Sequence, residues 1–129
     1  MKHVKIFGAL LVLHLLVWTG SHFYFQQNKS AILVVVDTSY SMKQNFPAVK
    51  KWIEDFESID RYKTIHIGTD KAFLGELAEL KSKDIIFRTS FGKLDSDNLT
   101  RIYSQIKSDL RYLLSDGSLE PPEWQVISF

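Results

Sequence analysis

The amino-acid sequence predicts an α/β protein in which a doubly wound, mostly parallel sheet is flanked by helices and preceded by one transmembrane helix. The sheet is indicated by residues 31–36, an unbroken apolar run rich in valine, which is typical of a strand buried on both faces. The flanking helices are indicated by stretches after position 45 in which apolar side chains recur every three or four residues. The membrane helix is indicated by residues 6–25, which are apolar and contain no Lys, Arg, Asp or Glu.

Length and composition set the outer limits of the interpretation. The chain has 129 residues, of which 45% are hydrophobic, and this is material for one domain. The formal net charge is +1 and no basic tail stands out, which argues against a nucleic-acid-binding protein. The absence of cysteine excludes disulfides and thiolate metal sites.

The amino-terminal segment predicts how the chain meets a membrane. Lys2 and Lys5 lie before the apolar stretch, so residues 1–5 are expected to form a short cytoplasmic tail. Residues 6–25 are just long enough to span a bilayer, although their densest part also matches the apolar region of a cleaved signal peptide. No A-x-A pattern follows, which favours an uncleaved signal anchor. We therefore expect a single-pass protein of the cell membrane, with a spacer at residues 26–30 and the domain outside the cytoplasm.

Three oxygen-bearing side chains follow the buried strand at every second position. They are Asp37, Ser39 and Ser41, within the segment D-T-S-Y-S. Open α/β sheets place their ligands at the carboxyl ends of strands, and carboxylate and hydroxyl oxygens suit a hard divalent cation. The same residue types also cap helices and form turns routinely, so a purely structural role is the alternative.

The segment D-T-S-Y-S matches the D-x-S-x-S pattern of the metal-ion-dependent adhesion site, and the chain here resembles the von Willebrand factor type A family. The resemblance implies that residues 31–129 form a shortened domain of that family. It also implies that Asp37, Ser39 and Ser41 bind Mg²⁺, or Mn²⁺ or Ca²⁺, directly or through water. A threonine from a second loop and an aspartate from a third loop complete the site in the family.

The two further ligands are less clearly marked in this sequence. The second-loop position holds Ser96 and Asp97, with residues 89–90 (Thr-Ser) further upstream, and no Gly-Gly-Thr is present. Asp97 has an equally good interpretation as a helix cap. The third-loop position is matched by Asp116 within residues 115–117 (Ser-Asp-Gly), a sequence that is also common in plain turns.

The remaining elements are expected in the following order. A helix begins near Pro47, a second strand covers residues 62–68, and a later helix buries apolar residues from Leu99 to Leu110. Residues 71–80 are compatible with a short edge strand or a helix, and the state of residues 84–88 stays open.

The last strand is expected at residues 124–129, after a strand that ends near Ser115. A parallel neighbour requires a crossover of a dozen or more residues, and the segment between Gly117 and Trp124 is shorter than that. We therefore expect this strand to run antiparallel or to pair with another chain.

The resemblance implies recognition rather than catalysis. In the family, a partner protein offers an acidic side chain to the open position of the metal, so we expect a membrane-anchored protein-binding module that assembles with other membrane or periplasmic proteins. A magnesium-dependent phosphohydrolase is the competing class, but its usual motif needs an aspartate where this chain has Ser39. No G-x-S-x-G elbow of a serine hydrolase is present. A scaffold that keeps the fold without binding metal is the third alternative.

Overall fold

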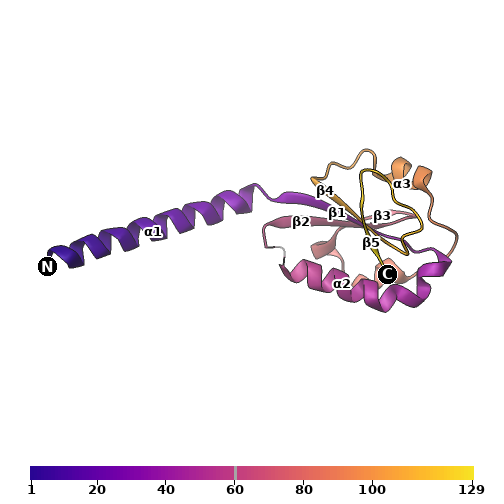
Figure 1. Cartoon of the computed structure of the whole chain (residues 1–129), viewed down its shortest axis with the longest axis horizontal. Coiled ribbons are helices and arrows are strands. Elements are labelled where there is room, and N and C mark those ends of the chain that lie inside the picture. Colours follow the sequence, from indigo (N-terminus) through magenta and orange to yellow (C-terminus); the bar gives the residue numbers. More distant parts are fainter. Residues whose placement is uncertain (60) are drawn as a thin grey trace.

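The computed structural model describes residues 1–59 and 61–129 and shows an α/β domain with one long amino-terminal helix (Figure 1). Helix α1 (Lys2–Gln27) projects from the domain, and none of its described residues is buried in the protein. The helix is long and apolar enough to cross a membrane, a property that signal sequences share. Only residues 28–29 separate it from the first strand, so most of the expected spacer at residues 26–30 belongs to regular structure.

The domain is built on a five-stranded sheet with the order β3-β2-β1-β4-β5. Strand β1 lies at the centre and pairs in parallel with both β2 and β4. Strand β3 is an antiparallel edge strand beside β2. The mostly parallel sheet expected from the sequence is confirmed, and its strands are β1 (Ser30–Val36), β2 (Lys63–Thr69), β3 (Phe73–Glu76), β4 (Leu110–Ser115) and β5 (Gln125–Ser128).

Both faces of β1 are buried, which explains its unbroken apolar sequence. Ile32, Val34 and Val36 join a cluster with helix α2 (Phe46–Ile59) on one face of the sheet. Leu33 and Val35 face the opposite way and join a cluster with helix α3 (Ser96–Tyr103). Since successive side chains of a strand point to opposite faces, a strand covered on both sides must be apolar throughout. The helices on the two faces make the sheet doubly wound, as expected (Figure 1).

The expectation for the last strand was wrong, because β5 runs parallel to β4. The pairs extend from Tyr112 and Gln125 to Ser115 and Ser128. The connecting residues 116–124 return without a helix, and Leu119 and Trp124 pack on the same cluster as α3. An extended chain advances about 3.3 Å per residue, whereas a helix advances only about 1.5 Å. A short extended crossover is therefore long enough to return the chain to the beginning of a parallel neighbouring strand.

Helix α3 is also shorter than expected. It ends at Tyr103, so the helix predicted to continue to Leu110 was wrong in its carboxyl-terminal half. Ile106 still packs against the apolar cluster, but it does so from the following loop, and Leu110 opens β4. The chain leaves the helix because Asp109 is bound to β1: its N–H donates to the Ala31 carbonyl at 2.8 Å, and its carboxylate accepts from the Ala31 N–H at 2.9 Å.

The two segments left open by the sequence have mixed local structure. The edge-strand alternative for residues 71–80 is confirmed by β3, which is followed by a single 3₁₀ turn, η2 (Leu77–Glu79). Residues 84–88 lie mostly within another 3₁₀ helix, η3 (Lys83–Phe87). A third, η1 (Tyr40–Asn45), precedes α2, which begins beside Pro47 as expected.

Candidate metal centre

An aspartate follows each of the three central parallel strands. Asp37 follows β1, Asp70 follows β2 and Asp116 follows β4. Backbone hydrogen bonds continue the sheet by one residue at this edge, from Asp37 N–H to the Leu114 carbonyl (2.9 Å) and from Asp70 N–H to the Val36 carbonyl (3.1 Å). The chain leaves β1 toward β2, whereas β4 pairs on its other side, so the order of the strands reverses between β1 and β4. Open sheets form their ligand crevice at such a reversal.

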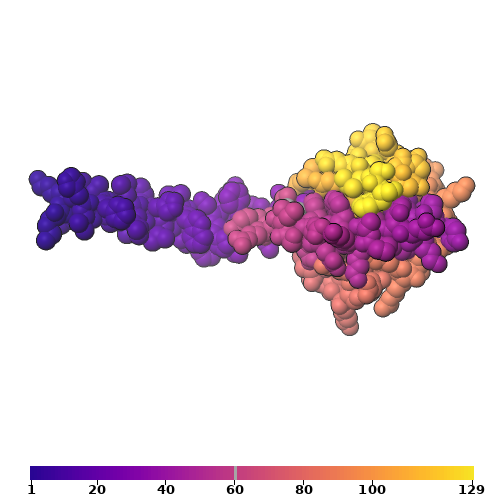
Figure 2. Space-filling view, turned by 60° about the horizontal axis from the view of Figure 1, so that its bottom comes forward, coloured from indigo at the N-terminus to yellow at the C-terminus, as the bar shows by residue number. Residues whose placement is uncertain are grey.

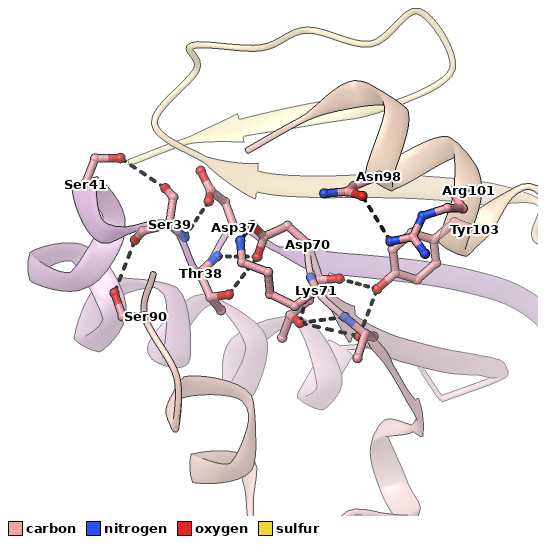
Figure 3. A network of polar contacts seen from close by, with 12 residues as sticks. Asp37, Thr38, Ser39, Ser41, Asp70, Lys71, Ser90, Asn98, Arg101 and Tyr103 are labelled. Atoms are coloured by element: carbon pink, nitrogen blue, oxygen red, sulfur yellow. Dashed lines mark hydrogen bonds and ion pairs between the residues drawn. The ribbon is translucent and has the colours of Figure 1, made fainter. Parts of the chain in front are cut away.

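Asp37 is the most unusual side chain at this edge. It is only 1% exposed, and its Oδ1 accepts a hydrogen bond from the Ser39 N–H at 2.8 Å. Its Oδ2 is buried and has no hydrogen-bond partner among the residues that the structure describes. The carboxylate lies on the same side of the loop as the hydroxyls of Ser39 and Ser41 (Figure 3). A buried unpaired carboxylate oxygen is costly, so this atom marks a place where a cation or a polar ligand fits.

A chain of polar contacts links Asp37's loop to the loop after β4. The hydroxyl oxygens of Ser39 and Ser41 lie 3.1 Å apart, and the Ser41 hydroxyl donates to Asp116 Oδ2 at 3.3 Å. A pocket of about 420 Å³ opens here, with Ser39, Ser41 and Asp116 in its lining. The structure thus brings Asp37, Ser39, Ser41 and Asp116 together, although 75 positions separate Ser41 from Asp116 in the sequence.

The two carboxyl groups of this cluster have opposite electrostatic environments. Burial raises the pKa of Asp37 above its ordinary value, and the nearby charges of Asp70 and Asp116 act in the same direction, against hydrogen bonds from Ser39. Hydrogen bonds from Ser118 hold the pKa of the exposed Asp116 carboxyl below its ordinary value. A cation beside Asp37 would relieve the cost of burying its negative charge.

Asp70 is a further polar residue of this edge that the sequence analysis did not single out. It is 1% exposed, and its Oδ1 accepts from the Thr38 N–H (2.9 Å) and from the Thr38 hydroxyl (2.6 Å). Its Oδ2 forms an ion pair with Lys71 (Figure 3). The carboxylate therefore holds the loop after β1 in place. The signal that could have revealed it is the same as for Asp37, an aspartate directly after a buried strand.

Ser96 and Asp97 do not join the pocket. Both are exposed in the first turn of α3, and neither belongs to the lining found among the described residues. Asp95 is the N-cap of this helix, and its Oδ1 accepts from the Asp97 N–H at 3.1 Å. The structure thus places both residues at the start of α3, outside the polar cluster around Asp37.

The second loop that does reach the site lies further upstream. The Ser90 hydroxyl donates to the Ser39 carbonyl at 3.3 Å, and the Phe91 N–H donates to the Thr38 carbonyl at 3.1 Å. The Gly92 carbonyl accepts from the Tyr40 N–H at 3.3 Å, and Gly92 is part of the pocket lining. The sequence offers Ser90 only as a residue further upstream than Ser96 and Asp97. In the structure, the Ser90 hydroxyl is hydrogen-bonded to the D-T-S-Y-S segment.

The available donor set is made of oxygen atoms. Asp37 and Asp116 supply carboxylates, and Ser39 and Ser41 supply hydroxyls. No group of three or more His, Cys, Asp or Glu side chains with metal-binding geometry occurs in the described part of the chain. A cation at this place would therefore be bound by few formal charges and several neutral oxygens, which fits Mg²⁺, Mn²⁺ or Ca²⁺ better than zinc or copper.

No protein-family model, curated protein or solved structure matches the chain. The functional interpretation therefore depends on the chain's own geometry, above all on the polar cluster around Asp37 and on the apolar helix α1.

Proposed function

We propose that this protein is a membrane-anchored module of the von Willebrand factor type A kind, which binds a divalent cation at Asp37 and captures an acidic side chain of a partner protein. The observation that carries the proposal is the buried Asp37 Oδ2, unpaired among the described residues and placed where the strand order reverses. The hydroxyls of Ser39 and Ser41 beside it supply the neutral oxygens of the D-x-S-x-S pattern.

Each residue of the cluster has a distinct part in this proposal. Asp37 would supply the buried negative charge, Ser39 and Ser41 would supply neutral ligands, and Asp116 would orient Ser41 through its hydrogen bond. A bound Mg²⁺ or Mn²⁺ supplies a Lewis acid that attracts a carboxylate oxygen. Lys93 lines the same pocket and adds a positive charge for an acidic partner.

The proposal is a binding protein rather than an enzyme. A phosphohydrolase of this architecture would need a second carboxylate near Asp37 that is able to transfer a proton, and the chain has Ser39 at that position. Of the other two carboxylates at this edge, Asp70 is engaged by Thr38 and Lys71. Asp116 accepts hydrogen bonds from the Ser41 hydroxyl and the Ser118 N–H. These contacts support recognition without turnover.

The membrane part of the proposal depends on α1. An uncleaved helix spanning residues 6–25, with Lys2 and Lys5 on the cytoplasmic side, would hold the domain outside the cytoplasm. The module would then present its partner-binding site next to other membrane or periplasmic proteins.

Calorimetric titration of the full chain with Mn²⁺ in detergent micelles tests the metal site. We expect binding by the wild-type protein and by the control Asp55→Asn, whose carboxylate is exposed on α2, and no binding by Asp37→Asn. Asp116→Asn should weaken the affinity by about 10- to 100-fold, the range for a residue that orients a ligand. A folded wild-type chain that binds no Mn²⁺ would contradict the proposal and leave a metal-free scaffold.

A further inference from the structure

The candidate metal centre and the membrane helix lie at opposite ends of the sheet. Helix α1 joins the domain at the amino end of β1, through residues 28–29 (Figure 1). Strands β2, β4 and β5 point in the same direction as β1, so their amino ends lie at this end as well. The sheet edge that carries Asp37 and Asp116 is the far one.

The beginning of β2 and the end of α2 approach the membrane helix. His22 Nδ1 of α1 and Tyr62 Oη lie 2.7 Å apart and share a hydrogen bond, and the two rings meet edge to face with centroids 5.6 Å apart. Phe25 of α1 also contacts Tyr62, with ring centroids 5.7 Å apart. In the space-filling view this part of the domain reaches back along α1 (Figure 2).

In a bilayer that α1 crosses, these contacts would set the depth of the segment. The apolar stretch of α1 extends to Phe25, and Tyr62 reaches His22, which lies three residues earlier in the helix. With a rise of about 1.5 Å per residue, Tyr62 reaches roughly 4–5 Å below the end of the apolar stretch. Tyrosine is suited to this interfacial depth because its ring is apolar and its hydroxyl is polar.

The surface around Tyr62 combines an exposed apolar side chain with basic ones. Ile59 is 77% exposed at the end of α2. A hollow of about 590 Å³ lies between this segment and α1, and the charged residues of its described lining, Arg61 and Lys63, are both basic. Ile59 fits the boundary of the acyl chains, and the basic side chain of Arg61 fits the phosphates of lipid head groups.

We propose that a basal surface formed by Ile59, Arg61, Tyr62 and Lys63 docks onto the anionic head groups of the bilayer that α1 crosses. Docking orients the domain so that the edge with Asp37 points away from the membrane. The inference goes beyond metal and partner binding, and it depends on α1 being retained as the anchor.

The absence of cysteine allows a single probe to be placed at will. Ile59→Cys carries an environment-sensitive NBD fluorophore in the full chain, reconstituted into phosphatidylcholine vesicles with or without phosphatidylglycerol. The matched control is Tyr40→Cys, which is 73% exposed at the far edge. We expect the emission at position 59 to shift to shorter wavelength in the vesicles with phosphatidylglycerol, and the emission at position 40 to stay at the value for water.

The contribution of charge is measured on the labelled Ile59→Cys protein. Arg61→Gln should lower the ratio of docked to undocked domains about fivefold, the effect of one basic residue at an anionic membrane surface. Lys43→Gln, in the 3₁₀ helix η1 that follows the far edge, should leave the ratio unchanged.

Three results would overturn the inference. Position 59 could be as accessible to water as position 40 in vesicles with phosphatidylglycerol, or its shift could be equally large in phosphatidylcholine alone. The chain could also be removed from the vesicles by an alkaline wash, which would mean that α1 is not an anchor. A Mn²⁺ titration of the same labelled protein reports on Asp37 separately, so failure of docking and failure of the metal site are distinguishable.

Discussion

Replacing Gly68 by alanine is expected to disrupt the contact that joins α3 to the end of β2. The Tyr103 hydroxyl shares its single hydrogen between the Thr69 carbonyl and the Ala72 carbonyl, whose oxygen lies 3.1 Å from the hydroxyl oxygen. A Cβ atom at Gly68 would lie 2.1 Å from the Tyr103 hydroxyl oxygen and 2.9 Å from the adjacent ring carbon. Since Tyr103 is fully buried, its ring must move for the methyl group to fit.

The expected loss of stability has two parts. Overpacking a filled interior costs about 1–3 kcal/mol, and loss of the shared hydrogen bond of the Tyr103 hydroxyl costs about 1–2 kcal/mol. Gly68→Ala should therefore reduce the free energy of unfolding by about 2–5 kcal/mol. Tyr103→Phe loses only the hydrogen bond, so it should cost about 1–2 kcal/mol.

A double-mutant cycle identifies the cause. Tyr103→Phe removes the oxygen that clashes, so adding Gly68→Ala to it should cost less than in the wild-type chain, with a coupling of about 1 kcal/mol or more. Thermal unfolding followed by circular dichroism measures the effect, since about 1 kcal/mol corresponds to roughly 4–8 °C in a domain of this size. Additive effects, or a Gly68→Ala protein as stable as the wild type, would refute the reasoning.

Two further predictions concern the buried carboxylates. The pKa of Asp37 is raised above 3.8 in the folded chain, so protonation of this group should stabilise the metal-free protein most below pH 3.8. That contribution to the free energy of unfolding should be lost as the pH rises through the raised pKa. Over this rise in pH, the urea midpoint should therefore fall less in Asp37→Asn than in the wild type. Lys71→Met leaves Asp70 buried without its cation and should cost about 3 kcal/mol in urea unfolding; an unchanged midpoint would show that Thr38 alone satisfies Asp70.

The central part of the fold was predictable because its sequence signals are local. Residues 31–36 are apolar without interruption, and the structure covers both of their faces. The spacing of the apolar residues of α2 likewise predicts which face of this helix packs against the sheet. Neither inference required knowledge of distant parts of the chain.

The incorrect expectations concern elements determined by distant contacts. Ile106 and Leu110 continue the helical spacing of α3, yet the pairing of Asp109 with Ala31, 78 positions away, takes this segment out of the helix. The direction of β5 depends on an extended crossover that is anchored by Trp124 on the α3 side of the sheet, and the length of the connection alone could not reveal it.

In the candidate site too, the sequence predicts what is local and does not predict contacts between distant residues. Asp37, Ser39 and Ser41 lie within one short segment, so their proximity follows from the sequence. The part played by Asp70 depends on β2 being the neighbour of β1, and the approach of Ser90 depends on how its loop folds over the Ser39 carbonyl. Sequence spacing carries neither piece of information.

The separation of the anchor from the site restricts the partner that the proposed function admits. The seven residues of β1, Ser30–Val36, lead from helix α1 to Asp37, and strands rise about 3.3 Å per residue, so Asp37 lies roughly 23 Å along the strand from the end that joins α1. A domain held upright by the basal surface around Ile59 would place the candidate metal centre beyond the reach of lipid head groups and of short membrane loops. In the proposed function, the partner that supplies the acidic side chain would then be a protein that itself extends well beyond the bilayer.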